Sequence, residues 1–428
     1  MKNTFLKSTI ILIIGGFITK LLGLIIKIAL TRYIGTTGIG LYSLILPSFL
    51  LCINLANLGL PTALNVLISS NKYNNKNLLF TSIIISLTID FIILITLLIF
   101  SSYISNNILN NTKLTLGLIS IGLVLPFITI SNALRSWFFA KEKMYSHVLT
   151  NIIEDIVKFL LIILVLPKLL NKGLEICIAF IILTNILTES SSIFIFLILM
   201  PKFNCKLKEL KPNSNNIKEL FKLAIPTTLS RLIGTIGYFL EPIIIMNVLL
   251  KLGYNELFIT NEYGIINGYV MQLVLLPSFF TGAISQALIP VISKNYVLNN
   301  KKYIKKKIKQ AIIISLMIGI PSTIIFELYP SYMLKLFFNT TKGIKYIKVF
   351  APICLFHYIQ SPISSALQAM KKAKYAAIGT FLGILLRTIS LYLFSLLNIG
   401  LWPIIIATSI NMIFVTIFDY LCVKKHLS

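Results

Sequence analysis

The chain has 428 residues, of which 57% are hydrophobic and only 12% are charged. Soluble domains have roughly 45–50% apolar and about 25% charged residues, so this composition excludes an ordinary soluble domain and predicts a protein of the lipid bilayer. The formal net charge of +26 would favour nucleic acid as the partner of a soluble protein, so the distribution of the charges must be considered before a partner is inferred.

Apolar stretches of about 20 residues, the length that a spanning helix needs, recur along the whole chain. Short polar segments rich in Lys and Asn separate them. We therefore expect an all-α membrane protein with twelve transmembrane helices. In chain order these cover approximately residues 8–31, 41–68, 78–102, 114–139, 148–167, 174–200, 219–249, 263–292, 309–329, 346–369, 375–397 and 400–422.

The basic residues are unevenly distributed between the two sides of these spans. Most lysines fall on the segments that share a side with both termini, including KKYIKKKIK at 301–309. This positive-inside asymmetry predicts a multi-pass protein with both termini cytoplasmic. The basic runs are then interpreted as determinants of orientation and as contacts with membrane lipids, and no nucleic acid is expected as a partner.

The N-terminus resembles a signal peptide in having Lys2 and Lys7 before an apolar run. The run is too long, contains two lysines and has no A-x-A-like cleavage site, so we expect it to be retained as the first span. The cysteines have neither metal-ligand nor disulfide spacing, and we expect no metal or cofactor. They are Cys52, Cys177, Cys205, Cys354 and Cys422.

The chain repeats itself. Three pairs of motifs recur in the same order: TKLLGLI at 19–25 with SRLIGTI at 230–236, ALNVLISSN at 63–71 with ALIPVISKN at 287–295, and SNAL at 131–134 with SSAL at 364–367. We infer two six-helix lobes, residues 1–202 and 217–428, joined by a cytoplasmic linker at 203–216. Because six is even, the repeats are parallel, pseudo-symmetric bundles, an arrangement found in transporters whose substrate site lies between the halves.

One face of the first predicted helix carries charge inside an otherwise apolar span. At about 100° per residue a narrow stripe collects Thr9, Gly16, Lys20, Gly23, Lys27 and Thr31, and Arg32 follows at its end. A lysine facing lipid at mid-bilayer costs roughly 3 kcal/mol or more, so Lys20 and Lys27 are expected to face a protein interior or a wet cavity. Their own helix has no acidic residue, which favours an anionic ligand.

The seventh predicted helix has a similar face, which collects Thr227, Ser230, Gly234, Gly237 and Glu241. Arg231 lies at the edge of this face, and the repeat places it opposite Lys20. Lys20, Lys27, Arg231 and Glu241 are therefore the candidate residues for an anionic headgroup. The alternative is structural, because glycine stripes also serve close helix packing and Arg231 could pair with Glu241.

Further ionisable residues lie within predicted spans. Glu154 and Lys158 are spaced i, i+4 and are expected to neutralise each other. Arg135 and Asp419 lie near the cytoplasmic ends of their helices and are expected to reach the interface. The other candidates for a cavity or for coupling to an ion are Arg32, Asp90, Asp155, Glu189 and Arg387, in addition to Glu154 and Lys158.

No catalytic constellation emerges from the sequence, so we do not expect an enzyme. The three histidines, His147, His357 and His426, are dispersed, and no phosphate-binding loop or ATPase domain is recognisable. Transport would then be driven by a coupling ion such as H⁺ or Na⁺, by the membrane potential, or by the gradient of the substrate.

Several longer segments resemble one transporter family. FLKSTIILIIGGFITKLLGLIIKIALTRYIGTTGIGLYSL and LANLGLPTALNVLISS are similar to the opening of the stage V sporulation protein B family of polysaccharide-type transporters. LAIPTTLSRLIGTIGYFLEPIII and SSALQAMKKAKYAA resemble stretches of its second lobe, so the likeness covers nearly the whole chain. The family is part of the MOP superfamily, with lipid II flippases, O-antigen flippases and multidrug and toxin extrusion (MATE) proteins.

The resemblance implies a V-shaped transporter of the bacterial cytoplasmic membrane. It would move a polyprenyl-diphosphate-linked saccharide, such as a cell-wall or spore-cortex precursor, by alternating access. Basic residues of the first helix would then meet the diphosphate, a role that falls on Lys20 and Lys27. Both are Lys where relatives often have Arg, which excludes a bidentate grip on phosphate. Longer relatives carry two additional C-terminal helices, which in lipid II flippases form a groove for the lipid tail.

Two other functions are compatible with the residues. A multidrug cation antiporter of the same superfamily would need a cavity dominated by carboxylates, for which the intramembrane acidic residues are available. A non-transporting scaffold for envelope or spore assembly would have no need of lysines on a glycine stripe. A comparison of binding to a lipid-linked diphosphate and to an organic cation distinguishes a flippase from a cation antiporter.

Overall fold

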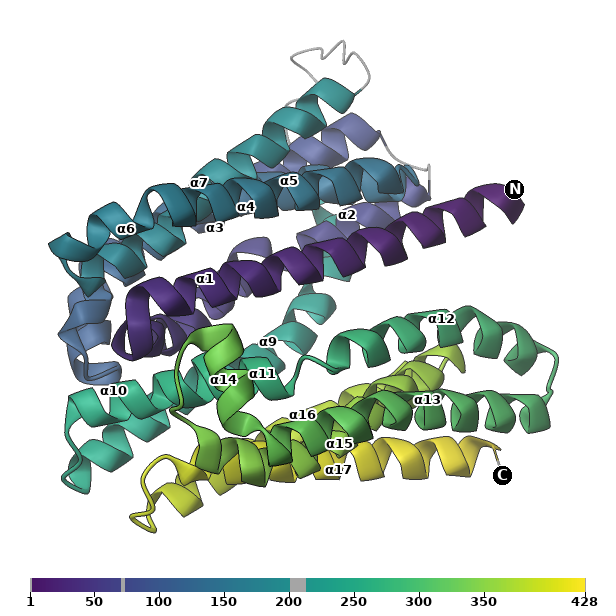
Figure 1. The fold of residues 1–428 in the computed structure, drawn as a ribbon. Coiled ribbons are helices and arrows are strands. Elements are labelled where there is room, and N and C mark those ends of the chain that lie inside the picture. The colour runs from purple at the N-terminus through teal and green to yellow at the C-terminus, as the bar shows by residue number, and fades with distance from the viewer. Residues whose placement is uncertain (1, 71–73, 201–212, 428) are drawn as a thin grey trace. The chain divides into compact units, whose positions relative to one another are not determined.

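The computed structural model describes residues 2–70, 74–200 and 213–427, and this part of the chain is helical, with no strand. The helices are α1 (Lys2–Asn57), α2 (Leu60–Ser69), α3 (Asn75–Tyr103), α4 (Thr115–Ala140), α5 (Met144–Leu164), α6 (Leu166–Leu169), α7 (Leu174–Leu199), α9 (Ser214–Lys251), α10 (Glu256–Gly264), α11 (Met271–Val274), α12 (Ser278–Val297), α13 (Lys301–Leu328), α14 (Pro330–Phe338), α15 (Ile344–Ala369), α16 (Ala373–Ser395) and α17 (Trp402–Leu427) (Figure 1). The expectation of an all-α protein is confirmed.

The chain separates into two compact units, residues 1–239 and residues 240–428, and the division lies within α9. We call these the first and the second unit. The predicted linker at 203–216 overlaps residues 201–212, which lie outside the described part. The predicted lobes 1–202 and 217–428 therefore stay a prediction.

Eight helices of the described part are long and apolar enough to cross a membrane, or nine if the bent pair Glu256–Val274 and Ser278–Val297 is one span. The sequence predicts twelve. Part of the difference is that one stretch, Ile14–Ser69, covers two predicted spans. In addition, α5 carries three charged residues within five positions, and α15 is interrupted by polar residues and two prolines. The arrangement of twelve helices in two bundles stays a prediction.

The first unit is built around α4, which packs against α2, α3 and α7. Phe138 is fully buried at its end, with its ring 4.9 Å from that of Phe196 and 5.0 Å from that of Trp137. Leu220 and Ala224 of α9 are buried in the same cluster. The beginning of α9 therefore belongs to the core of the first unit.

The second unit is built around α15, which packs against α12, α13 and α17, while α16 packs along α17 (Figure 1). Small residues allow the close approach of the last two helices. An added Cβ at Gly379 would lie 2.6 Å from the ring of Phe418, and one at Gly383 would lie 2.4 Å from Val415. Close packing over small residues is a characteristic way in which helices associate inside membranes.

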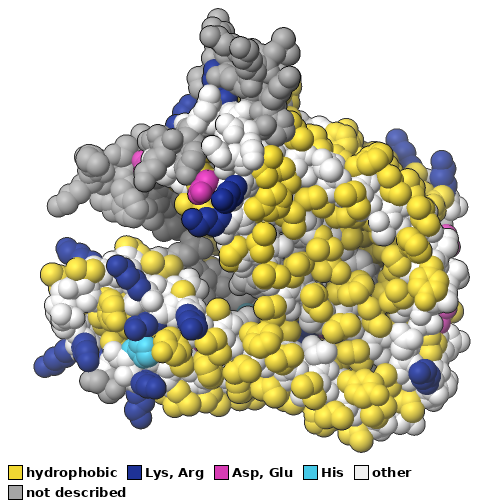
Figure 2. All heavy atoms as spheres, turned by 180° about the vertical axis from the view of Figure 1, so that it is seen from behind, with side chains coloured by type: hydrophobic (Ala, Val, Ile, Leu, Met, Phe, Trp, Pro, Cys, Tyr) yellow, Lys and Arg dark blue, Asp and Glu magenta, His cyan; other side chains and the backbone are white. Residues whose placement is uncertain are grey.

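Apolar side chains cover much of the surface that Figure 2 shows. On α3, Phe91 is 63% exposed and Ile99 is 66% exposed, and on α13 Met317 is 69% exposed. Soluble monomers rarely expose contiguous apolar patches larger than a few hundred Å². These faces are suited to contact with lipid acyl chains.

Candidate functional site

The first helix displays the predicted basic stripe on an open face. Lys20, Lys27 and Arg32 are all exposed on α1. A Cβ added at Gly16 or Gly23 would meet no atom within 4 Å. The glycines of this stripe therefore do not serve close helix packing, which was the structural alternative for α1, and the lysines lie beside open space.

Arg231 lies in the first unit and is exposed. Its Nη2 donates a hydrogen bond to Oγ1 of Thr62 on α2 over 3.0 Å. Near it, Asn54 Nδ2 of α1 donates to Oγ1 of Thr235 over 2.9 Å. The face of α9 that carries Arg231 is thus held against the α1–α2 region by polar contacts.

Close approach of the backbone fixes this region further. Gly59, between α1 and α2, has φ 62°, and a Cβ added there would lie 2.2 Å from Oγ1 of Thr227. A side chain would be unfavourable in the left-handed conformation and would also collide with α9. Glycine is therefore required where α2 begins.

Glu241 is not the partner of Arg231, and that alternative is wrong. Glu241 is only 4% exposed and forms an ion pair with Arg387 of α16, which is 8% exposed. The hydroxyl of Tyr263 donates to Glu241 Oε1 over 2.9 Å. Both side chains are engaged in this buried pair. The predicted roles of Glu241 in headgroup binding and of Arg387 in coupling stay predictions.

Arg135 turns inward instead of reaching the interface. Its Nη2 lies 2.5 Å from Glu154 Oε1 and 3.9 Å from Glu189 Oε2. Ser192 also donates a hydrogen bond to Glu154. The guanidinium is engaged by carboxylates of the same unit, so the expectation that Arg135 reaches the interface is wrong.

Tertiary contacts supplement the expected interaction of Glu154 with Lys158. Arg135 and Ser192 engage Glu154, whereas Lys158 Nζ donates to Oδ1 of Asn185 on α7 over 3.3 Å. Lys158 also interacts electrostatically with Asp155, Glu189, Glu154 and Lys27. The structure thus brings charged candidates from α1, α4, α5 and α7 into one polar cluster of the first unit.

Two buried aspartates lie outside this cluster. Asp90 of α3 is fully buried, and Thr129 of α4 donates to its Oδ2 over 2.6 Å. Asp419 of α17 is also fully buried and accepts a hydrogen bond from Ser364 of α15. The expectation that Asp419 reaches the interface is therefore wrong.

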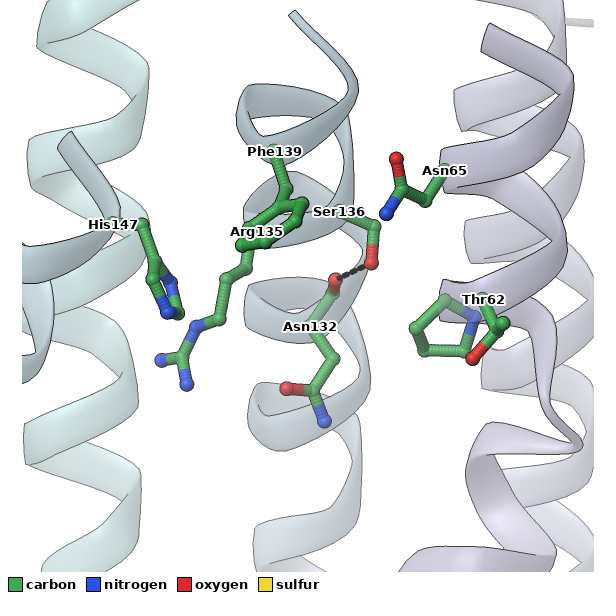
Figure 3. Close-up of a pocket in the computed structure, with 8 residues that line it drawn as sticks. Thr62, Asn65, Asn132, Arg135, Ser136, Phe139 and His147 are labelled. Carbon is green, nitrogen blue, oxygen red and sulfur yellow. Dashed lines mark hydrogen bonds between the residues drawn. The ribbon is translucent and has the colours of Figure 1, made fainter. Parts of the chain in front are cut away.

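A hollow of about 270 Å³ opens beside Arg135 in the first unit (Figure 3). Its polar residues were not predicted, although Asn132 belongs to the SNAL motif and Asn65 to ALNVLISSN. An asparagine in an apolar span is the signal that could have identified them. The hollow is lined by Pro61, Thr62, Asn65, Asn132, Arg135, Ser136, Phe139 and His147.

The sequence has well-defined relatives. The pattern of the family described as polysaccharide biosynthesis protein matches residues 5–296, and that of MatE matches residues 267–393. Stage V sporulation protein B of Bacillus subtilis (strain 168) is 29% identical over 438 residues, which cover 100% of this chain and 85% of the relative. Lipid II flippase MurJ of the same organism is 21% identical over 464 residues, which cover 100% of this chain and 84% of the relative.

A solved structure described as the inward-facing conformation of a multidrug resistance MATE family transporter of the MOP superfamily has a similar fold. The TM-score is 0.75 at 17% identity, and the match covers 96% of this chain and 94% of the other. At this identity the likeness concerns the fold alone. The relatives and the apolar helices identify the chain as a multi-pass protein of the bacterial cytoplasmic membrane. It belongs to the family described as polysaccharide biosynthesis protein.

Proposed function

We propose that the protein is a flippase that moves a lipid-linked, polyprenyl-diphosphate saccharide across the membrane by alternating access. The observation that carries this proposal is the exposed basic face of α1, where Lys20 and Lys27 lie beside glycines with open space around them. The relatives named as a lipid II flippase and as a sporulation protein support this class of substrate.

The chemistry of the headgroup explains why two cations are needed. A diphosphate carries at least two negative charges, and it must leave water for a partly desolvated cavity. Seven residues place Lys20 and Lys27 about 10 Å apart along one face, at about 1.5 Å of rise per residue. Two flexible ammonium groups at this distance can converge on one diphosphate or transfer it along the path.

The proposal is tested by transport of a fluorescent lipid-linked diphosphate sugar in proteoliposomes. Lys20→Ala with Lys27→Ala is expected to reduce the rate at least tenfold, and Lys20→Arg is expected to retain more activity than Lys20→Gln, because charge is the required property. Lys172→Ala is the matched control, since Lys172 is exposed in the α6–α7 connection. Wild-type rates in the double alanine variant would contradict the proposal.

A multidrug cation antiporter is the second candidate, because the solved MATE structure shares the fold. An organic cation would need carboxylates that are available to it. In the first unit Glu154 is engaged by Arg135, and in the second unit Glu241 is engaged by Arg387. Binding of an organic cation in preference to the lipid-linked diphosphate would favour this alternative.

A further inference from the structure

The hollow beside Arg135 has the chemistry of a sugar-binding pocket. Figure 3 shows the side chain of Asn65 on α2 across from Ser136 on α4, with Asn132 below them and Arg135 directed towards His147. Amides and hydroxyls donate and accept hydrogen bonds, which matches the hydroxyl groups of a saccharide. The ring of Phe139 supplies an apolar surface against which the C–H face of a sugar can pack.

The interior of this pocket is electrically balanced. Arg135 Nη2 lies 2.5 Å from Glu154 Oε1, so the guanidinium is compensated by a carboxylate of the same unit. A balanced site favours an uncharged ligand, and the amides and hydroxyls of its lining favour a ligand that forms hydrogen bonds.

The rim of the pocket is cationic. Arg231 donates to Thr62, which lines the hollow, and among the described residues it has no acidic partner within salt-bridge distance. An anionic group bound beside Thr62 would be stabilised by this guanidinium. The neutral interior matches the sugar of a glycosyl phosphate, and the cationic rim matches its phosphate.

The internal repeat indicates that the polarity of Asn65 is not a requirement of the fold. When ALNVLISSN is placed against ALIPVISKN, Asn65 corresponds to Ile289. When SNAL and the residues after it are placed against SSAL, Asn132 corresponds to Ser365 and Arg135 to Gln368. The second repeat thus has an apolar residue in place of Asn65 and different polar residues in place of Asn132 and Arg135, which favours a ligand as the reason for Asn65 in the first repeat.

We infer that this pocket binds the first sugar residue of the lipid-linked substrate, with the adjoining phosphate at Arg231. The inference rests on the proposed function and adds where the saccharide is recognised. A volume of about 270 Å³ is slightly below the roughly 300–1,000 Å³ of pockets for drug-sized ligands, so it holds a single sugar unit.

The test compares two probes, a fluorescent polyprenyl diphosphate without sugar and the same lipid carrying one N-acetylated hexose, in binding to the full chain in detergent. The wild type is expected to bind the sugar-bearing lipid about tenfold more tightly, because the sugar adds hydrogen bonds that the sugar-free lipid cannot form. Asn65→Ile with Asn132→Ser installs the residues of the second repeat. We expect this variant to bind both lipids equally, at the affinity of the wild type for the sugar-free lipid.

Two further variants complete the experiment. Arg231→Gln is expected to weaken the binding of both lipids by the same factor, because both contain the phosphate. Ser365→Ala with Gln368→Ala, at the equivalent positions of the second unit, is the control and is expected to keep the tenfold difference. Asn65→Ile alone is the second variant if the double variant is not monodisperse.

The outcomes separate the two proposals. Equal binding of both lipids by the wild type, or a tenfold difference that persists in Asn65→Ile with Asn132→Ser, would overturn the sugar pocket while leaving the flippase proposal intact. No binding of either lipid by the wild type would overturn both.

Discussion

At the scale of single residues, the ion pair of Glu241 and Arg387 is the most deeply buried pair of opposite charges in the described part of the chain. Glu241→Leu leaves the guanidinium of Arg387 without its carboxylate in apolar surroundings. We expect the free energy of unfolding to fall by about 3–5 kcal/mol, because an uncompensated buried charge is far more costly than a missing pair. Thermal unfolding of the detergent-solubilised protein measures the loss as a lower melting temperature.

The control for this prediction removes both charges. Glu241→Leu with Arg387→Leu leaves no buried charge at this position, so it is expected to recover most of the stability that the single variant loses. An unchanged melting temperature in Glu241→Leu, or a double variant less stable than the single one, would contradict the prediction.

The partners of buried charges could be predicted from the sequence only where local spacing decides them. The i, i+4 spacing favours Glu154 with Lys158, but this rule describes exposed helix surfaces. In the folded unit Arg135 approaches Glu154 from another helix, and Lys158 donates a hydrogen bond to Asn185. Arg387 and Glu241 are 146 residues apart, so no spacing rule connects them. The sequence placed these residues within predicted spans; their partners depend on tertiary packing.

At the scale of helices, the break in α1 depends on one glycine. Gly35 has φ 64° and ψ −171°, a conformation almost restricted to glycine, between the two helical parts of α1. Gly35→Ala is expected to destabilise the protein by about 1–3 kcal/mol. A Cβ at this position would meet no atom within 4 Å, so the whole effect arises from backbone strain. The melting temperature in detergent is the measurement.

Gly23→Ala is the matched control for Gly35→Ala. Gly23 lies in the same α1 helix, and an added Cβ there also meets no atom within 4 Å. Its backbone is helical, so alanine is expected to stabilise the protein by roughly 0.5–1 kcal/mol. Equal melting temperatures of the two variants would show that the Gly35 conformation is not required.

Hydrophobic length predicted the positions of several helices. Predicted spans at 78–102, 114–139 and 174–200 coincide closely with α3, α4 and α7. The spans at 8–31 and 41–68 both lie within the stretch Ile14–Ser69, and the predicted gap between them contains Gly35, where the helix breaks. The short polar segment around Gly35 thus marked the break, although the backbone resumes a helix directly after it.

At the scale of the whole molecule, the sequence predicted a helical membrane transporter and the basic face of α1. It did not predict the pocket beside Arg135, because its lining comes from α2, α4 and α5, and their side chains meet only after packing. Nor could it show that the beginning of α9 packs into the first unit, where Leu220 is buried with residues of α2 and α4. Contacts between distant segments depend on how the surfaces of the helices fit together, and composition and periodicity do not reveal this fit.

The second unit has two distinct ends that bear on orientation. At one end the ring of Tyr375 lies 4.8 Å from that of His426, which brings the start of α16 to the end of α17. At the other end the hydroxyl of Tyr254 donates to the carbonyl of Asn398 over 3.2 Å, which joins the α9–α10 connection to the α16–α17 connection. The first end carries Lys371, Lys372 and Lys374. The positive-inside rule favours the cytoplasm for this basic end.

We therefore expect both termini and the connection around Asn300 to be cytoplasmic, and the connection at Asn398 to be external. The test introduces one cysteine at a time, Asn300→Cys or Asn398→Cys, into a variant without the five native cysteines. A membrane-impermeant maleimide added to intact cells is expected to label Asn398→Cys and to label Asn300→Cys only after the cells are opened. The physical reason is that lysine-rich segments such as 301–309, at the start of α13, stay on the side from which the chain is inserted. Labelling of Asn300→Cys from outside, with Asn398→Cys protected, would reverse the topology and place the basic runs on the external face.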